Sequence, residues 1–175
     1  MKFSFNHLKQ FVPDLKSPEE LREILTAHLF EVESVEGDVL DVKILPNRYS
    51  DAASYAGLAR EVAAVLETKV VPRLRSGTKK FQKAGGMLDL VVEVEERGLC
   101  PRYMARYFEI EANAPTPTWM REALEASGMR SINAVVDIMN YVMMETGQPM
   151  HAFDADKLKG IVVRRARAGE KIETL

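Results

Sequence analysis

Residues 31–45 read EVESVEGDVLDVKIL, and this stretch decides the fold of the first part of the chain. Polar and apolar side chains alternate over residues 31–37, which is typical of a half-exposed strand. Apolar positions recur in the same way over 38–45, and Gly37-Asp38 between the two runs is suited to a tight turn. The stretch therefore predicts a β-hairpin that turns at Gly37.

Helical patterns flank this hairpin on both sides. Before it, Ser17, Pro18 and Glu20 predict an N-cap, a first helical residue and a capping box. We expect the buried stripe of that helix at Leu21, Ile24, Leu25 and His28 or Leu29. After the hairpin, a polar loop over 46–51 leads into the most regular helical stripe of the chain, at Tyr55, Leu58, Ala59, Val62, Val65 and Leu66.

A short helix capped by Ser4 completes a set of three helices, with the hairpin before the last. This order is similar to that of winged-helix modules, so residues 1–72 are expected to form a small three-helix winged-helix-like N-terminal domain. Such a module makes binding to duplex DNA an alternative function. Against it, residues 1–70 hold 8 Lys+Arg and 12 Asp+Glu, and an acidic surface repels phosphate.

A polar stretch without periodicity, followed by Gly85-Gly86, predicts a linker over 73–86. Beyond it, apolar runs predict strands over 87–95, 102–110 and 161–167. Thr116-Pro117 is expected to cap and open a helix that includes Trp119 as a packing anchor. The chain as a whole is therefore predicted to be α+β, with a partial mixed α/β domain over 87–175.

Residues 134–145 are apolar around most of a helical circumference, which predicts a helix buried on nearly all sides. Asp137 and Asn140 lie on one face of it, and buried polar groups need partners. The partner of each side chain is either neighbouring backbone or a ligand, and the sequence leaves both open. For Asp154 and Asp156, capping of the next turn is favoured over cation binding.

The composition of the 175 residues excludes several functions. The single cysteine, Cys100, rules out an intrachain disulfide and is expected to be a small buried residue rather than a nucleophile. His7, His28 and His151 are too far apart for a zinc motif. A net charge of −2 shows no basic excess for nucleic acid, and no apolar run has the length of a signal peptide or membrane span. We expect a cytoplasmic protein with no membrane partner.

Four segments of the chain carry a family resemblance. They are Met1-Lys2-Phe3-Ser4 with Glu31-Val32-Glu33, Pro46-Asn47-Arg48 with residues 57–64, Cys100-Pro101-Arg102-Tyr103, and the run 132–154, INAVVDIMNYVMMETGQPMHAFD. In this order they resemble the β subunit of bacterial phenylalanyl-tRNA synthetase. The resemblance implies that residues 1–72 correspond to the first domain of that subunit and that 87–175 correspond to the first part of its editing domain.

The sequence departs from this family at two places. The usual subunit carries an inserted oligonucleotide-binding-fold domain after a segment like 31–37, whereas here Gly37 runs directly into Asp38. Moreover, the resemblance stops at residues 169–175, inside the editing domain. We therefore expect a fragment or a reduced form of the subunit. An open sheet edge in the second domain is expected to promote self-association.

The resemblance implies a ligase that joins phenylalanine to its tRNA as an α2β2 assembly. Its synthetic site lies on the α subunit, so ATP and Mg would be used there and no cofactor is expected on this chain. The family's β subunit adds hydrolysis of tyrosine wrongly esterified to the tRNA, because a pocket that fits phenylalanine cannot exclude tyrosine without limit. The implied partners are the α subunit and tRNA, the latter weakened by the missing insertion.

His151 and Asn140 match the family's editing pocket and are the expected catalytic residues. The resemblance implies that the imidazole positions water or holds the 3′ ribose, and that the asparagine amide orients the substrate. Met139 stands where the family usually has threonine. The family's acidic residue that reads the tyrosine hydroxyl belongs to a part of its sequence after Leu175, so the isolated chain is expected to be inactive. The alternative is a non-catalytic module that binds tRNA or a protein.

Overall fold

The computed structural model describes residues 1–72, 90–110 and 114–173. The chain divides into two compact units: unit 1 is Met1–Gly77 with Ala112–Ala152, and unit 2 is Thr78–Glu111 with Phe153–Leu175. The described residues hold six α-helices and five strands, so the protein is α+β, as the sequence predicted. None of these helices combines the length and the apolar character that crossing a membrane requires.

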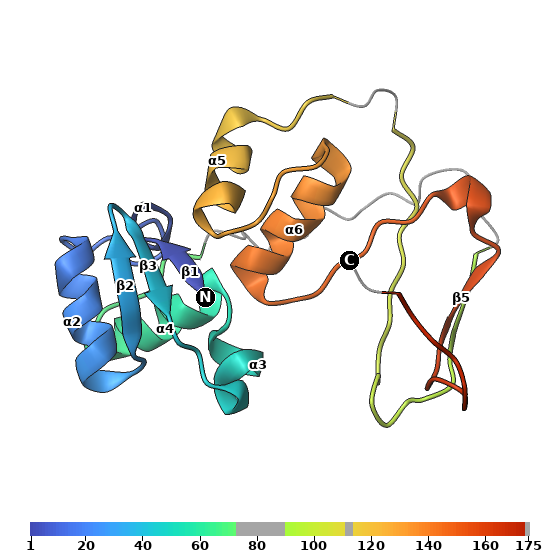
Figure 1. Ribbon diagram of the computed structural model, residues 1–175, viewed down its shortest axis with the longest axis horizontal. Coiled ribbons are helices and arrows are strands. Elements are labelled where there is room, and N and C mark those ends of the chain that lie inside the picture. The colour runs from blue at the N-terminus through green and yellow to red at the C-terminus, as the bar shows by residue number, and fades with distance from the viewer. Residues whose placement is uncertain (73–89, 111–113, 174–175) are drawn as a thin grey trace. The chain divides into compact units, whose positions relative to one another are not determined.

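The elements of unit 1 are β1 (Lys2–Ser4), α1 (Phe5–Leu8), α2 (Pro18–His28), β2 (Val32–Glu36), β3 (Val39–Val42), α3 (Tyr49–Ala52), α4 (Tyr55–Val65), α5 (Thr118–Ala126) and α6 (Ala134–Thr146). Those of unit 2 are β4 (Val91–Val94) and β5 (Gly160–Val163). Figure 1 labels the helices and most of the strands along the ribbon.

The predicted hairpin is confirmed by the antiparallel pairing of β2 with β3, in which Glu36 lies opposite Val39. The sequence did not indicate β1. This strand pairs with the other edge of β3, with Phe3 opposite Leu40, and the sheet order is β1-β3-β2 (Figure 1). The central strand β3 therefore pairs with the N-terminal strand β1 along one edge and with β2, its partner in the hairpin, along the other.

The hairpin turn is held by backbone conformation and by side chains of the N-terminal segment. Gly37 has a φ of +62°, which glycine adopts without the steric penalty of a Cβ atom. The Asp38 carboxylate accepts hydrogen bonds from Ser4 Oγ at 2.7 Å and from Asn6 Nδ2 at 3.0 Å. The backbone N–H of Phe5 donates to the Asp38 carbonyl at 2.6 Å. The two-residue turn is thus tied directly to the start of α1.

Helix α2 begins where the sequence predicts, but its capping differs in one contact. Ser17 Oγ accepts the backbone N–H of Glu20 at 3.2 Å, and Pro18 opens the helix. The Glu20 carboxylate accepts the backbone N–H of Lys16 at 2.7 Å, so the expected capping box closes one residue earlier than predicted. This bond lowers the pKa of Glu20.

The polar loop predicted over 46–51 is instead a 3₁₀ turn, Pro46–Arg48, that continues into α3. Arg48 lies 2.7 Å from Asp51 Oδ2 and 3.0 Å from Glu61 Oε2, which ties the turn to α4. Helices α3 and α4 meet so closely that a Cβ atom on Gly57 would overlap the Asp51 carbonyl oxygen. Because α3 is an additional short helix, the first 72 residues contain four α-helices rather than the expected three.

The core of unit 1 joins both of its chain segments. Helix α2 packs against β2, β3 and α4, while α5 contacts β1 and α6 contacts α4. Fully buried side chains come from nearly every element and include Phe3, Leu8, Leu21, Leu25, Leu40, Leu58 and Leu124. Helices α5 and α6 therefore complete the core formed by the N-terminal elements, although these two helices lie far from those elements in the sequence. The predicted linker lies outside the described residues.

Unit 2 contains a parallel pair of strands, with Val92 of β4 opposite Ile161 of β5. The strand predicted over 161–167 is confirmed only as far as Val163. The strand predicted over 102–110 is wrong, because this segment has irregular backbone and exposes side chains such as Met104 and Phe108. Apolar and β-branched residues form a strand only where a neighbouring strand completes the hydrogen bonds.

Candidate functional site

Helix α6 carries the predicted site residue Asn140 and defines the candidate site. Its start is capped by Asn133, whose side chain accepts the backbone N–H of Val136 at 3.1 Å, and Gly147 ends it with a φ of +76°. One face is buried, at Asp137, Tyr141, Met144 and Glu145. The expectation that it is buried on nearly all sides holds only in part, since Ile138 is 44% exposed and most of the other residues of the helix are half-buried.

Asp137 lies on the buried face of α6 and is fully buried. Ser131 Oγ donates to its carboxylate at 2.6 Å, the backbone N–H of Ile132 donates at 2.9 Å, and the Thr116 hydroxyl donates as well. Burial by itself would raise the pKa of this carboxyl, but the hydrogen bonds from Ser131, Thr116 and Ile132 outweigh burial and lower it. Thr116 therefore holds Asp137 and does not cap α5, whose cap is Pro117.

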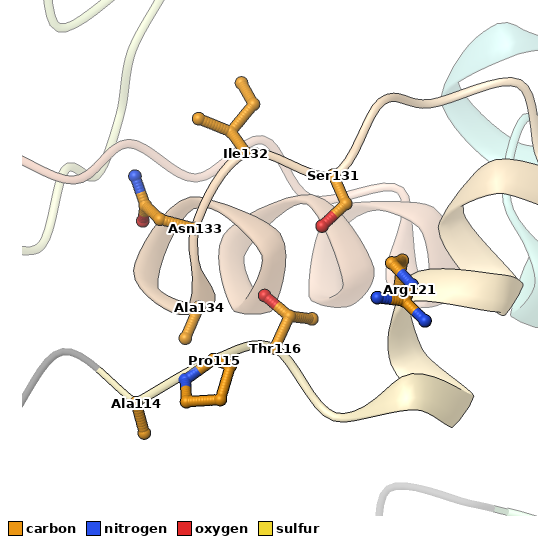
Figure 2. Close-up of a pocket in the computed structure, with 8 residues that line it drawn as sticks. All are labelled: Ala114, Pro115, Thr116, Arg121, Ser131, Ile132, Asn133 and Ala134. Atoms are coloured by element: carbon orange, nitrogen blue, oxygen red, sulfur yellow. The ribbon is translucent and has the colours of Figure 1, made fainter.

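A pocket of about 270 Å³ opens beside this cluster. Its wall consists of residues 114–116 and 131–134 together with Arg121 of α5 (Figure 2). Figure 2 shows the hydroxyls of Thr116 and Ser131 pointing toward each other, while Ile132 points away. Both hydroxyls are engaged by Asp137. Neither residue of the predicted editing pair lines this pocket.

A second polar cluster occupies the other end of the buried face of α6. Glu145 Oε1 accepts a hydrogen bond from the Tyr141 hydroxyl at 2.6 Å and lies 3.1 Å from Nε2 of His7 in α1. His7 and Glu145 are 7% and 4% exposed. The His7 ring packs edge-on against Tyr55, with ring centroids 4.4 Å apart. The sequence carried no signal for this cluster, because 138 residues separate its histidine from its carboxylate.

The two predicted editing residues differ in their surroundings. Asn140 is half-buried on α6, between the two polar clusters. His151 lies in the irregular segment after α6 and is exposed, so its apolar neighbours in the sequence do not bury it. The catalytic assignment of both residues stays a prediction.

Two other side chains named from the sequence, Asp154 and Trp119, make contacts that stabilise the local fold. Asp154 accepts the backbone N–H of Asp156 at 3.2 Å and pairs with Lys157 at 3.1 Å, which confirms that it caps a turn. Trp119 is 56% exposed, yet its ring packs edge-on against Tyr141 with centroids 5.3 Å apart. Within 1–72, 90–110 and 114–173, no group of three or more His, Cys, Asp or Glu is arranged to hold a metal ion.

Comparison with known proteins first identifies a class of domain. Residues 99–175 match the family model of the B3/4 domain. Nearly the whole chain then resembles larger proteins. The phenylalanine–tRNA ligase β subunit of Geobacter metallireducens is 44% identical over 152 residues, which are 84% of this chain and 18% of the relative.

Two further relatives carry the same name. The phenylalanine–tRNA ligase β subunit of Moorella thermoacetica is 42% identical over 172 residues, which are 92% of this chain and 21% of the relative. That of Neisseria meningitidis serogroup A is 47% identical over 137 residues, 77% of this chain and 17% of the relative. The chain is therefore a homologue of the bacterial phenylalanine–tRNA ligase β subunit, as its four signature segments predicted. It spans about a fifth of the length of these relatives.

Proposed function

We propose that this chain acts within a phenylalanine–tRNA ligase β subunit and contributes Asn140 and His151 to a site that hydrolyses tyrosine wrongly esterified to tRNA. One observation carries the proposal. Helix α6 is anchored through a single face, which leaves Asn140 on its flank and His151 exposed just beyond its end. Exposure makes the histidine accessible to the 3′ end of a bulky substrate.

The chemistry assigned to the two residues follows from their functional groups. An imidazole can orient a water molecule or hold the 3′ ribose, and a carboxamide can both donate and accept hydrogen bonds to an ester substrate. Met139 contributes no hydroxyl beside Asn140, and neither Asn140 nor His151 lines the pocket beside Asp137. We infer that the 175-residue polypeptide by itself does not hydrolyse Tyr-tRNA at a useful rate.

The first experiment tests that inference. The purified polypeptide and its His151→Ala variant are mixed with tRNA charged with tyrosine, and release of tyrosine is followed over time. We expect both proteins to match the uncatalysed rate. Hydrolysis by the polypeptide that disappears in His151→Ala would contradict the inference and would place a complete site on these residues.

The second experiment tests the site itself. Residues 1–175 replace the matching region of the Geobacter metallireducens β subunit, which is then assembled with its α subunit. We expect His151→Ala and Asn140→Ala to lower Tyr-tRNA hydrolysis at least tenfold and to leave Phe-tRNA formation unchanged. His28→Ala, a change of an exposed histidine on α2, serves as the matched control. Equal hydrolysis by all variants would rule out the assigned pair.

The proposed partners follow from the same assignment. They are the α subunit, which would use ATP and Mg for synthesis, and tRNA, in the cytoplasm. The region 1–72 is proposed to be a winged-helix-like module of that assembly. Its antiparallel sheet β1-β3-β2, packed against α2, supports this description.

A non-catalytic module that binds tRNA or a protein is the second candidate. It is favoured by the absence of Asn140 and His151 from the wall of the pocket beside Asp137. Gel-shift measurements with tRNA and duplex DNA at two salt concentrations separate the candidates, because binding to phosphate weakens as salt rises. Salt-dependent tRNA binding that His151→Ala leaves unchanged, together with unchanged hydrolysis in the assembled subunit, favours this second candidate.

A further inference from the structure

Helix α6 is held in unit 1 by two carboxylates on the same face. Asp137 lies near its start and Glu145 near its end, eight residues apart, and Tyr141 stands midway between them. Residues four positions apart on a helix are neighbours on its surface, so the three side chains form one line. Asn140 directly precedes Tyr141 and is half-buried.

The two carboxylates have partners of different origin. Asp137 is bonded to Thr116, Ser131 and Ile132, which precede it by at most 21 residues. Glu145 faces His7 of α1 at 3.1 Å, across 138 residues of sequence. The first anchor is therefore local to the α5–α6 region, whereas the second fixes α6 to the N-terminal elements.

The surroundings of His7 make the second anchor sensitive to charge. Tyr141 and Glu145 face its ring from α6, and Tyr55 faces it from α4. Burial raises the pKa of Tyr55, so this phenol stays neutral around pH 7. The carboxyl group of Glu145, 3.1 Å from Nε2 of His7, is the acidic partner of this ring. Because both side chains are buried, water screens their interaction only weakly.

We propose that His7 and Glu145 are positioning residues, which set through Tyr141 where α6 presents Asn140. With its N-terminal end held by Asp137, α6 can change its rotation or axial position where the second anchor yields. Asn140 lies between the anchors and follows that change. The biological meaning rests on the proposed editing function, but the mechanical coupling does not. His7 and Glu145 touch no reacting atom in this scheme, and they act only through the helix.

Nuclear magnetic resonance of the full 175-residue chain tests the coupling without any substrate. The side-chain amide of Asn140, assigned by its loss in Asn140→Asp, is followed at one fixed pH. In Glu145→Gln, which keeps the shape of the side chain and removes its charge, we expect the amide signal to shift from its position in the unmodified chain.

Matched controls separate positioning from a general effect on the fold. Glu125→Gln changes an exposed carboxylate on α5, and His28→Gln changes an exposed histidine on α2, so both should leave the amide signal of Asn140 in place. If Glu145→Gln fails to fold, as judged by the fluorescence of Trp119, His7→Gln replaces it and should shift the amide signal. Any other pattern overturns the proposal.

The assembled hybrid subunit links the coupling to the reaction. We expect Glu145→Gln to lower the kcat of Tyr-tRNA hydrolysis at least fivefold and to leave KM unchanged. A kcat equal to that of Glu125→Gln overturns the positioning role. Absence of hydrolysis in the unmodified hybrid overturns the proposed function alone, since the amide measurement does not depend on it.

Discussion

The hydroxyl of Tyr55 lies 3.0 Å from that of Ser127, the C-cap residue of α5, which follows 72 positions later in the chain. The same hydroxyl accepts the backbone N–H of Ser4 at 2.6 Å. Tyr55 is 1% exposed. A single buried phenol therefore joins α4, the end of α5 and the start of α1. These elements belong to the two separate chain segments of unit 1.

Replacement of Tyr55 by phenylalanine is expected to destabilise unit 1. The ring remains packed, but the buried N–H of Ser4 loses its acceptor, a loss that costs about 1–3 kcal/mol. Urea unfolding followed by the fluorescence of Trp119 measures the change. Tyr49→Phe is the control, because Tyr49 is 56% exposed and its change should stay within about 0.5 kcal/mol. Equal effects of the two variants would contradict the role given to the Tyr55 hydroxyl.

Gly57→Ala is expected to lower stability although alanine is the better helix former. A Cβ atom at this position would overlap the carbonyl oxygen of Asp51, so α3 and α4 must separate, at about 1–3 kcal/mol. At the exposed Ala64 of the same helix, Ala64→Gly should cost about 1 kcal/mol through helix propensity alone. Chemical unfolding of the two variants measures both effects. A stabilised Gly57→Ala protein would disprove the close approach of the two helices.

Asp137→Asn tests the carboxylate cluster at the start of α6. Hydrogen bonds lower the pKa of Asp137, so its charged form stabilises the fold at pH values above the ordinary value of 3.8. That stabilisation is lost as the pH falls through the lowered value. We expect the variant to be about 1–3 kcal/mol less stable at pH 7 and the difference to shrink below pH about 4. Unfolding curves at both pH values measure it, with the exposed Asp156→Asn as control.

Glu170 offers a test within unit 2. Arg164 donates to both of its carboxylate oxygens, at 2.8 and 2.9 Å, and the backbone N–H of Arg167 donates as well. These bonds lower the pKa of Glu170 from 4.5 to about 2. In Arg164→Gln we expect the carboxyl pKa, measured by nuclear magnetic resonance, to rise toward 4.5.

Arg165→Gln is the matched control for that titration. Arg165 pairs with Glu96 at 2.6 Å, so its removal should leave the pKa of Glu170 near 2. The lowered pKa of Glu170 fixes how the contribution of this pair to stability depends on pH. The pair favours the folded state above pH 4.5 and ceases to do so as the pH falls through about 2. An unchanged pKa in Arg164→Gln would show that the bidentate pair does not form.

The local elements of the first 72 residues could be predicted because their signals are local. The turn at Gly37, the cap at Ser17 and the apolar stripe of α4 each depend on neighbours within one helical turn or one hairpin. Strand β1 was missed, because three residues give no period and the strand exists only through its pairing with β3. The run 102–110 failed for the converse reason, since its β-forming residues have no ladder partner in the described part of unit 2.

The candidate site was predictable only in part. The apolar helix with polar residues at Asp137 and Asn140 was visible in the sequence, and so was the need of a buried Asp137 for partners. Which face of that helix is covered depends on contacts with α4 and α5, which no local pattern encodes. The partnership of His7 with Glu145 lies beyond sequence reasoning for the same reason.

The division of unit 1 between Met1–Gly77 and Ala112–Ala152 has a consequence for how the protein can be taken apart. Two separate polypeptides with these limits would each carry one side of the contacts Tyr55–Ser127 and His7–Glu145. They should reassociate by fragment complementation, because each exposes apolar surface that only the other covers. The stability of the reassembled unit would then rise with the concentration of the fragments, as it does for a heterodimer.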